Sequence, residues 1–406
     1  MRGLPRSGRQ RGRSGGRDPE PPSHKLPRAG LPAGDATGCD ALGHQARALG
    51  HCPTQRHARV RNPERRADLG SGGLHPPARS GRGAVVDATL QKLYRPVQED
   101  LDALVGLIAR ELGADEPFLD ELVAHVLRTR GKLIRPALTF LCAQATGEPG
   151  PDRFLVAAAV ELIHVASLIH DDIIDESTLR RGEPTANARW GNQVAVLLGD
   201  YLFSKSFHLL ARVGRDDVQS RMALATVRMS QAELLQIRYG NTPHMEEAIY
   251  FRIVEGKTAQ LIASACACGA LVSGADRELA ERLGRFGLHW GIAFQITDDT
   301  LDLTSDPQVL GKPIGSDVRS GKVTLPVIHA LRHARDGGRE RLERILREGD
   351  LETLREELVR CGSIEYARQV AHTHAGRALA ELDALPPAPA RDSLVGLTEF
   401  VLVRDR

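Results

Sequence analysis

A five-residue acidic pattern that occurs twice constrains this chain more than any other feature. The first copy, DDIID, spans residues 171–175, and the second, DDTLD, spans residues 298–302. On a helix, the first and last acids of each copy leave the same face one turn apart, where like charges repel. Apolar residues flank both copies, so the helices that carry the acids are expected to be buried beside them. Each copy therefore requires a countercharge.

Mg²⁺ is the countercharge that this pattern favours. Carboxylate oxygens are the ligands that Mg²⁺ prefers, and the ion removes the repulsion between Asp171 and Asp175. Asp172 lies about 100° round the helix from Asp171 and is expected at the edge of the site. The alternative is a helix end with charges exposed to water, but a second copy 127 residues later makes that alternative less favourable. Two such clusters facing each other across a helical bundle would hold several Mg²⁺ ions.

Apolar periodicity predicts an all-α fold for residues 86–406. Leu and Ala recur at helical spacing in segments such as PDRFLVAAAVELIHVASLIHDDIIDE, and strand-like alternation is almost absent. With 41% hydrophobic but only 4% aromatic residues, the core is expected to consist mainly of aliphatic side chains, which suits packed helices. We therefore expect a single helical domain of about 320 residues, which is large for one domain.

Residues 1–85 form an extension rich in Arg, Gly and Pro. Residues 1–86 carry 15 Arg and one Lys against six acidic residues, a net charge of +10, whereas the remainder carries −8. The extension has no apolar periodicity, so it is expected to be disordered. A transit peptide and a nucleic-acid-binding tail are alternatives, but we favour the interpretation that this segment lies upstream of a true start near Val85 or Val86. No nucleic-acid partner is expected, because the extension has no aromatic residue for base stacking.

Cysteine spacing and hydropathy indicate a cytoplasmic protein. The six cysteines form no CxxC pair and follow no apolar signal segment, which favours reduced thiols. No run of about eighteen uncharged apolar residues occurs, so no membrane-spanning helix is expected.

Basic residues near the acidic copies indicate that the ligands are rich in phosphate. Lys and Arg donors bind phosphate oxygens directly, whereas carboxylates bind them through a metal ion. The pattern therefore suggests two such ligands, one on metal and one on basic side chains. The candidate cations are Lys132 and Arg135 of GKLIRP, Arg180 and Arg181, Lys257, and Lys312 and Lys322.

These motifs together resemble the trans-polyprenyl diphosphate synthases, the isoprenoid chain-elongating prenyltransferases. The resemblance covers residues 87–406 and rests on GKLIRP, DDIID followed by RRG, the KT pair at Lys257, FQITDDTLD and GKPIGSDVRSGKVTLP, all in family order. It implies an all-α isoprenoid synthase fold, with a helical bundle around a central cavity. A homodimer and about three Mg²⁺ ions bound with diphosphate are also implied.

The resemblance assigns roles to individual residues. The metal ligands would be Asp171, Asp175, Asp298 and Asp302. The isopentenyl diphosphate site would comprise Lys132, Arg135, His164 and Arg181. The allylic diphosphate would contact Arg180, Lys257, Thr258 and Gln295, with Lys312 and Lys322 closing over it. One departure is Leu133, which stands where a basic residue is common, so isopentenyl binding is expected to be weakened but retained.

The activity implied is Mg²⁺-dependent head-to-tail condensation of isopentenyl diphosphate with an allylic diphosphate. Ala166 and Ser167 stand five and four residues before the first acidic copy, where short-chain members carry a bulky aromatic floor. Small residues there favour a long all-trans product of about six to ten isoprene units, of the kind attached to quinones and handed to membrane enzymes. The alternative is that both are simply small residues of a closely packed helix.

Three other functions remain as alternatives. A farnesyl or geranylgeranyl diphosphate synthase would make a shorter product with the same chemistry. A class I terpene cyclase also uses an aspartate-rich motif, but it lacks GKLIRP and has a different second metal motif. A non-catalytic subunit of a heteromeric synthase would lose its acidic motifs, whereas this chain retains both.

Overall fold

The structure of the chain is a computed structural model. It describes residues 81–113, 115–129, 131–240, 242–304 and 315–403. The interpretation of the N-terminal extension therefore lies outside the described residues up to residue 80, as does the expected role of Lys312.

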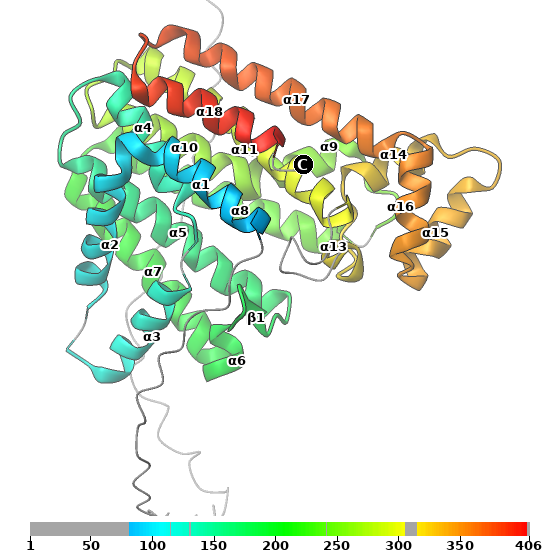
Figure 1. The fold of residues 1–406 in the computed structure, drawn as a ribbon. Coiled ribbons are helices and arrows are strands. Elements are labelled where there is room, and N and C mark those ends of the chain that lie inside the picture. The colour runs from blue at the N-terminus through cyan, green and yellow to red at the C-terminus, as the bar shows by residue number, and fades with distance from the viewer. Residues whose placement is uncertain (1–80, 114, 130, 241, 305–314, 404–406) are drawn as a thin grey trace, which may run out of the picture. The chain divides into compact units, whose positions relative to one another are not determined.

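The described residues are almost entirely helical, as the periodicity predicts, and their only strands form a two-residue hairpin (Figure 1). The first elements are α1 (Gly81–Tyr94), η1 (Arg95–Val97), α2 (Gln98–Leu112), α3 (Pro117–Arg128), α4 (Ile134–Thr146), α5 (Asp152–Ile174), β1 (Leu179–Arg180), β2 (Glu183–Pro184), α6 (Ala186–Trp190), α7 (Asn192–Val213) and α8 (Asp216–Tyr239). The remaining elements are α9 (Glu247–Val254), η2 (Glu255–Ala259), α10 (Gln260–Leu271), α11 (Arg277–Thr304), α13 (Ser316–Arg319), α14 (Leu325–His333), α15 (Gly338–Glu348), α16 (Leu351–Arg360), α17 (Ser363–Glu381), η3 (Leu382–Ala384) and α18 (Pro389–Val403).

Long helices packed side by side build the core. α5 packs along α7, and α11 packs between α10 and α17. Most of the buried side chains are Leu, Ala, Val and Ile, as expected from the low aromatic content. The fold class predicted from the sequence is therefore confirmed.

Two glycines bring α11 unusually close to the helix that precedes it. A Cβ atom at Gly287 would lie 2.8 Å from the Ala263 Cα atom, and one at Gly291 would lie 2.6 Å from the Ala259 Cα atom. Neither approach leaves room for a side chain. The two glycines therefore fix the distance between α11, which carries residues 298–302, and the helical segment that carries Lys257.

Two core helices, α5 and α7, are long and apolar enough to cross a membrane on the criteria of length and composition alone. The sequence test missed them because it tolerated no charged residue in the apolar run. In α5, 56% of the apolar window is buried inside the protein, and the helix packs along α7. A core helix of this kind passes the same test, so the two helices are weak evidence for a membrane segment.

A pair of histidines joins α11 to α17. The Nδ1 atoms of His289 and His374 lie 3.2 Å apart, and the His374 ring stacks on Phe251 with ring centroids 6.0 Å apart. Burial, together with the nearby His289 and Arg377, lowers the pKa of His374 from its ordinary value of 6.5 to about 4. His374 is therefore neutral in the folded protein at neutral pH.

We expect this pair to destabilise the fold as the pH falls. Between pH 6.5 and 4 the unfolded chain takes up a proton at His374 that the folded protein does not, so the stability present above pH 6.5 is lost on acidification. His374→Phe should make the decline in unfolding free energy shallower. Urea unfolding at about pH 7.5 and pH 5 measures the difference, with His372→Phe on the exposed face of α17 as the control. Equal declines in wild type and His374→Phe would show the prediction to be wrong.

Candidate functional site

The first acidic copy lies at the C-terminal end of α5. Asp175 caps this end, with its backbone N–H donating to the Asp171 carbonyl oxygen at 2.8 Å, and Glu176 then leaves the helix in the left-handed region with φ 48°. The end of a helix where carbonyl groups are exposed carries partial negative charge. Asp171 and Asp175 therefore repel both each other and the helix end, which makes cations from elsewhere in the chain favourable.

Two lysines from distant segments supply such cations. The Lys257 Nζ atom lies 3.4 Å from an Asp171 oxygen and 2.6 Å from a Glu233 oxygen, and the Lys322 Nζ atom lies 3.0 Å from an Asp175 oxygen. Burial raises the pKa of Asp171 although Lys257 lowers it, and the pKa of Lys257 is raised because Asp171 and Glu233 outweigh its burial. The structure thus brings both lysines to the acids, as the sequence predicts for a shared site.

Asp172 forms an ion pair with Arg180, whereas Asp171 and Asp175 pair with the two lysines. The Arg180 Nε atom donates to both carboxylate oxygens at 3.0 and 2.9 Å, and its Nη2 atom donates at 2.7 Å. Asp172 is only 4% exposed, so the pair is largely removed from water. The hairpin of β1 and β2, which turns at Arg181 and Gly182 with positive φ angles, folds Arg180 back onto α5. In this structure Arg180 is therefore the ion-pair partner of Asp172.

The second acidic copy, near the end of α11, divides in the same way. Asp298 is exposed, whereas Asp299 is buried. The Tyr250 hydroxyl donates to Asp299 Oδ2 at 2.6 Å, and Gln295 Nε2 donates to Asp299 Oδ1 at 2.7 Å. Burial and then Asp317 raise the pKa of Asp299 to about 8. The buried middle acid is thus held by hydrogen bonds, and Asp298 faces solvent.

Asp302 anchors the segment that carries Lys322. Its carboxylate accepts the Asp317 backbone N–H at 3.0 Å, and its carbonyl oxygen accepts the Gly315 N–H at 2.8 Å. The segment is thereby held against α11, within reach of Asp175 on α5. Asp302 therefore contributes to the geometry of the site whether or not it binds a metal ion.

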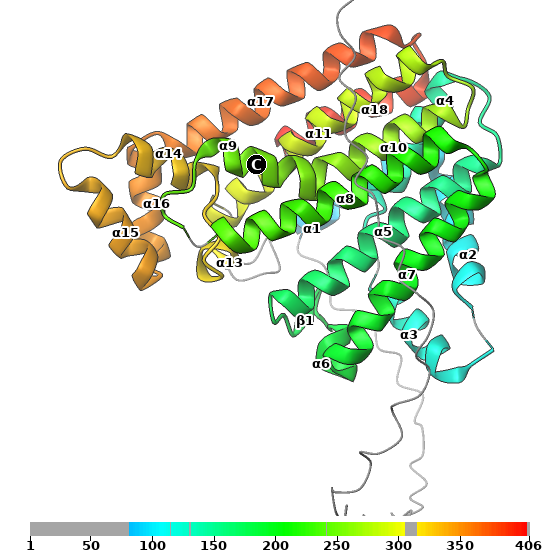
Figure 2. The ribbon, with the colours of Figure 1, turned by 180° about the vertical axis from the view of Figure 1, so that it is seen from behind.

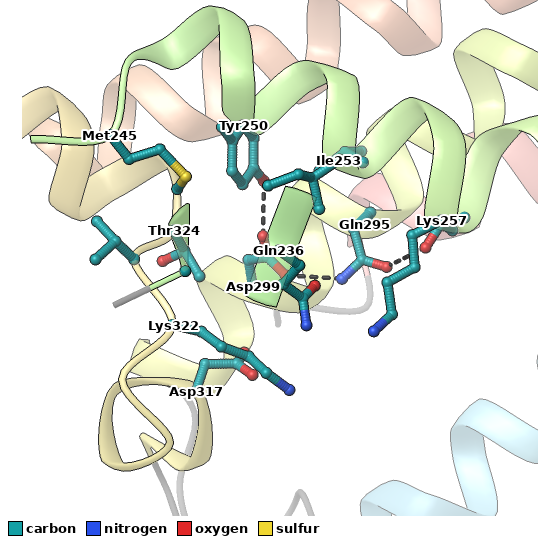
Figure 3. Close-up of a pocket in the computed structure, with 14 residues that line it drawn as sticks. Gln236, Met245, Tyr250, Ile253, Lys257, Gln295, Asp299, Asp317, Lys322 and Thr324 are labelled. Atoms are coloured by element: carbon teal, nitrogen blue, oxygen red, sulfur yellow. Dashed lines mark hydrogen bonds between the residues drawn. The ribbon is translucent and has the colours of Figure 1, made fainter. Parts of the chain in front are cut away.

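A cavity of about 130 Å³ lies beside the second acidic copy, and Figure 3 shows its polar lining. Lys257, Gln295 and Asp299 contribute polar groups from one side, and Asp317 and Lys322 contribute them from the other (Figure 3). The full lining is Gln236, Gly240, Met245, Tyr250, Ile253, Val254, Lys257, Thr258, Gln295, Asp299, Asp317, Lys322, Val323 and Thr324. The cavity therefore combines acids, ammonium groups and apolar side chains, as binding of an anionic group with an apolar tail requires.

A separate electropositive group surrounds His164 on α5. Burial lowers the pKa of His164 well below its ordinary value, and Arg135, Arg181 and Arg180 lower it further. Burial also lowers the pKa of Arg135 to about 10, against the opposing effect of Glu161. Among the residues that the structure describes, the Arg135 Nε atom has no hydrogen-bond partner. These residues have the charge and the open donor of an anion site.

The loop at the start of the GKLIRP motif packs against the Arg181 side chain. The Arg181 Nη1 atom donates to the Thr129 carbonyl oxygen at 2.6 Å, and a Cβ atom at Gly131 would lie 2.6 Å from Arg181 Nη2. Gly131 is therefore needed for the guanidinium to lie against this loop, while Lys132 beside it is exposed. The structure brings Arg135, His164 and Arg181 together, and their role in binding isopentenyl diphosphate stays a prediction.

The two proposed chain-length residues lie on α5. Ala166 is fully buried, and the Ser167 hydroxyl donates to the His164 carbonyl oxygen at 2.8 Å. Neither is among the residues that line the cavity beside the second acidic copy. Their role in product length therefore stays a prediction.

The sequence interpretation missed several residues of the site. Glu233 binds Lys257, Tyr250 binds Asp299, and Asp317 lines the cavity. Glu161 is buried beside Arg135 and Arg181, which both lower its pKa, although burial raises it overall. A charged residue inside the apolar run VAAAVELIHV was a signal for Glu161, but no local pattern marks Tyr250.

The carboxylates fit a divalent cation by their chemistry. In the part of the chain that the structure describes, no group of three or more His, Cys, Asp or Glu side chains forms a preassembled metal site. Asp171 and Asp175 instead hold lysine ammonium groups, and Asp298 is exposed. Oxygen donors from few carboxylates suit Mg²⁺, which completes its ligand shell with water and phosphate oxygens.

Comparison with known proteins gives consistent matches. The family model described as polyprenyl synthetase matches residues 116–360. The octaprenyl diphosphate synthase of Escherichia coli (strain K12) is 35% identical over 321 residues, which are 78% of this chain and 99% of that protein. The short chain isoprenyl diphosphate synthase of Methanothermobacter thermautotrophicus is 41% identical over 289 residues, or 69% of this chain and 89% of that protein. A solved structure of a polyprenyl synthase from Caulobacter crescentus, complexed with calcium and isoprenyl diphosphate, is 33% identical with a TM-score of 0.73 and covers 78% of this chain and 97% of that chain.

We expect Arg180→Ala to destabilise the protein by about 2–3 kcal/mol, because it leaves the buried Asp172 carboxylate without its partner. Arg180→Lys should recover only part of this loss, since the ammonium group restores the charge but not the planar pair of donors that matches the carboxylate. Urea unfolding monitored by circular dichroism measures the effect. The control is Arg212→Ala, which breaks an ion pair with Glu111 that water reaches more easily and should cost less than about 1 kcal/mol. Equal losses in Arg180→Ala and Arg212→Ala would contradict the structural role of the Asp172–Arg180 pair.

Proposed function

The chain belongs to the polyprenyl synthetase family, and from that premise we propose that it condenses isopentenyl diphosphate head to tail with an allylic diphosphate. The observation that carries the proposal is the division of the site into two parts. One part combines two acidic copies with Lys257 and Lys322, and the other gathers Arg135, His164 and Arg181. Two diphosphates with different binding chemistry fit this division.

The allylic diphosphate is assigned to the acidic part. In the transfer, the bond between C1 of this substrate and the diphosphate oxygen breaks. Breaking it leaves an allylic cation and a fully charged diphosphate. Lys257 and Lys322 are positioned to donate to the departing diphosphate once it displaces them from Asp171 and Asp175. Positive groups that meet charge as it develops are usually the largest contribution to such a step.

Mg²⁺ fits the same part of the site. Asp171, Asp175, Asp298 and Asp302 would hold it, and it would supply further positive charge to the leaving diphosphate. The similar polyprenyl synthase from Caulobacter crescentus is complexed with calcium and isoprenyl diphosphate, which supports binding of a divalent cation by this chain. The number of ions, expected to be about three, follows only from the family resemblance.

Isopentenyl diphosphate is assigned to the basic part. Arg135 and Arg181 carry a permanent positive charge. His164, which its lowered pKa keeps neutral, adds an uncharged hydrogen-bonding group. Lys132, exposed in the adjacent loop, completes the set of donors. Because Arg and Lys side chains donate directly to phosphate oxygens, this substrate would be bound by the protein without a bridging metal ion.

The reaction then needs little further chemistry from the protein. The double bond of isopentenyl diphosphate attacks C1 of the allylic cation, a carbon–carbon bond forms, and the cation moves to the tertiary carbon of the new unit. Loss of a proton, which the released diphosphate accepts, restores a double bond. The protein's part is to hold the two substrates in line and to exclude water, which would otherwise capture the cation.

We propose a long-chain product because Ala166 and Ser167 leave no aromatic floor on α5. The relative from Escherichia coli is named for an eight-unit product, whereas the relative from Methanothermobacter is named for short chains, so family membership alone does not fix the length. The volume available beside these two residues decides it. A quinone side chain, and hence transfer to membrane enzymes, is the use that a long product suggests. The unpaired thiols Cys142, Cys266, Cys268 and Cys361 are consistent with a cytoplasmic location.

We also propose that the protein is a homodimer that pairs through α7 and α8. Large apolar side chains on these helices are exposed, among them Leu197 at 65%, Leu234 at 67% and Ile237 at 60%. The two helices lie on the same side of the protein (Figure 2), and a surface of this kind usually marks an interface. The other members of the exposed set are Val196, Phe207, Leu224 and Val227.

Product analysis tests the function. The full chain with Mg²⁺, labelled isopentenyl diphosphate and farnesyl diphosphate should give chains longer than twenty carbons, sized after dephosphorylation. Chelation of the metal should abolish elongation, and Asp171→Asn should reduce it by about 100-fold or more, because the leaving diphosphate loses its main countercharge. Absence of elongation in the wild type would favour a cyclase or a non-catalytic subunit.

Ala166→Phe is the matched variant for product length. It should shorten the product while leaving consumption of isopentenyl diphosphate in the first condensation within about twofold, because the reacting groups lie elsewhere. A wild-type product that stops at fifteen or twenty carbons would overturn the long-chain proposal. An unchanged distribution in Ala166→Phe would show that Ala166 does not face the growing chain.

Leu234→Glu should convert the dimer into a monomer, because it places a charge at the centre of the proposed apolar interface. Sedimentation velocity of both proteins at the same concentration measures the change. Val359→Glu on α16, where Val359 is 60% exposed, is the control for an added charge outside the interface. A monomeric wild type, or a Leu234→Glu variant that remains dimeric, would disprove the interface.

A further inference from the structure

Tyr250 takes part in a chain of hydrogen bonds that ends at the reacting side of the cavity. Its hydroxyl donates to Asp299 Oδ2 at 2.6 Å, Gln295 Nε2 donates to Asp299 Oδ1 at 2.7 Å, and the Thr258 hydroxyl donates to Gln295 Oε1 at 2.8 Å. All four residues line the cavity, and Figure 3 shows Tyr250 and Gln295 on opposite sides of Asp299. Tyr250 itself is only 4% exposed.

A π-helical turn makes this chain of contacts possible. Residues Glu255–Ala259 form a π-helix between α9 and α10, and the Gln260 N–H donates to the Glu255 carbonyl oxygen. In an α-helix two turns take about seven residues, whereas the extra residue of a π-turn makes them eight. Tyr250 and Thr258, eight residues apart, therefore share one face. On α11, Gln295 and Asp299 are four residues apart and meet that face with successive turns.

These hydrogen bonds determine which end of the Gln295 side-chain amide lies against Asp299 and which end lies on the Thr258 side. In the hydrogen bonds of the structure, Asp299 Oδ1 accepts from the Gln295 NH₂ group and Asp299 Oδ2 accepts from the Tyr250 hydroxyl, so the NH₂ end of the amide lies against Asp299. The carbonyl oxygen must then lie on the Thr258 side, next to Lys257. A carbonyl oxygen directed at a developing cation stabilises it, and an NH₂ group in the same place would repel it.

We propose that Tyr250 is a positioning residue that acts through Asp299 to hold the Gln295 carbonyl oxygen towards the reacting end of the allylic substrate. The inference rests on the proposed prenyl transfer. Without the Tyr250 hydroxyl, one Asp299 oxygen loses its donor and the carboxylate is free to rotate, so the amide of Gln295 loses its fixed orientation. The tyrosine ring packs edge-on against Phe251, with centroids 5.6 Å apart, and that contact does not depend on the hydroxyl.

Tyr250→Phe removes the hydroxyl and keeps the ring. We expect kcat to fall by about 10- to 100-fold while both KM values stay within about twofold, because substrate binding is left intact and cation stabilisation is lost. In a Gln295→Ala background the same change should have no further effect on kcat, since there is no amide left to orient. A full additional loss in that background would overturn the proposal.

Tyr366→Phe is the matched control. The Tyr366 hydroxyl also donates to a carboxylate, Glu247 Oε1 at 2.7 Å, at the start of the same helix α9. Tyr366 is not among the residues that line the cavity, so its variant should retain wild-type kcat. If Tyr366→Phe reduced kcat as much as Tyr250→Phe, a general effect on α9 would account for both.

A second readout separates this inference from the proposed function. In protein labelled with ¹⁵N-glutamine, the side-chain amide of Gln295, identified by its absence in Gln295→Ala, should exchange slowly with solvent in the wild type and quickly in Tyr250→Phe. This measurement needs no substrate. Unchanged protection in Tyr250→Phe would refute the positioning role even if the enzyme is active. Changed protection in a protein that elongates no prenyl chain would instead refute the proposed function.

Discussion

Negative charge at the C-terminal ends of two helices is the constraint on which the rest of this site depends. α5 ends in the first acidic copy and α11 in the second, so the acids add to the negative ends of both helix dipoles. Such an arrangement is stable only when cations reach it from elsewhere in the chain. At the end of α5, the lysines of the η2 turn and of the segment after α13 meet that need, and they bring three distant segments together.

Both acidic copies use their middle acid for structure. Asp172 is held by the Arg180 guanidinium, and Asp299 by a tyrosine and a glutamine. Each middle acid is buried, so its hydrogen bonds are shielded from water and hold the end of its helix in one conformation. The three acids of each copy therefore differ in their contacts and are not three equivalent ligands. The two neighbouring arginines also have different partners. Arg180 donates to Asp172, whereas Arg181 donates to the Thr129 carbonyl oxygen.

The sequence predicts the parts of this site that depend on local spacing. Helical periodicity gives the fold class, and the i, i+4 spacing gives the shared face of Asp171 and Asp175. The order of motifs indicates that Lys257, Gln295 and Lys322 belong to the same site. Contacts between distant segments are different, because nothing near Glu233 or Tyr250 in the chain marks its partner. The π-turn is also invisible to a periodicity test, which assumes a constant number of residues per turn. The Arg180–Asp172 pair is close in the sequence, but it depends on the β1–β2 hairpin, which helical periodicity does not predict.

The separation between Asp175 and Lys322 affects how the protein is made. These residues lie 147 positions apart, so at ~5–20 residues per second the ribosome adds the lysine roughly 7–30 s after the acid. Arg180, only eight residues after Asp172, is available almost at once. The partner of Asp172 is therefore synthesised early. Asp171 and Asp175 stand at the end of α5 for longer before the ammonium groups that offset their repulsion in the folded protein have been synthesised.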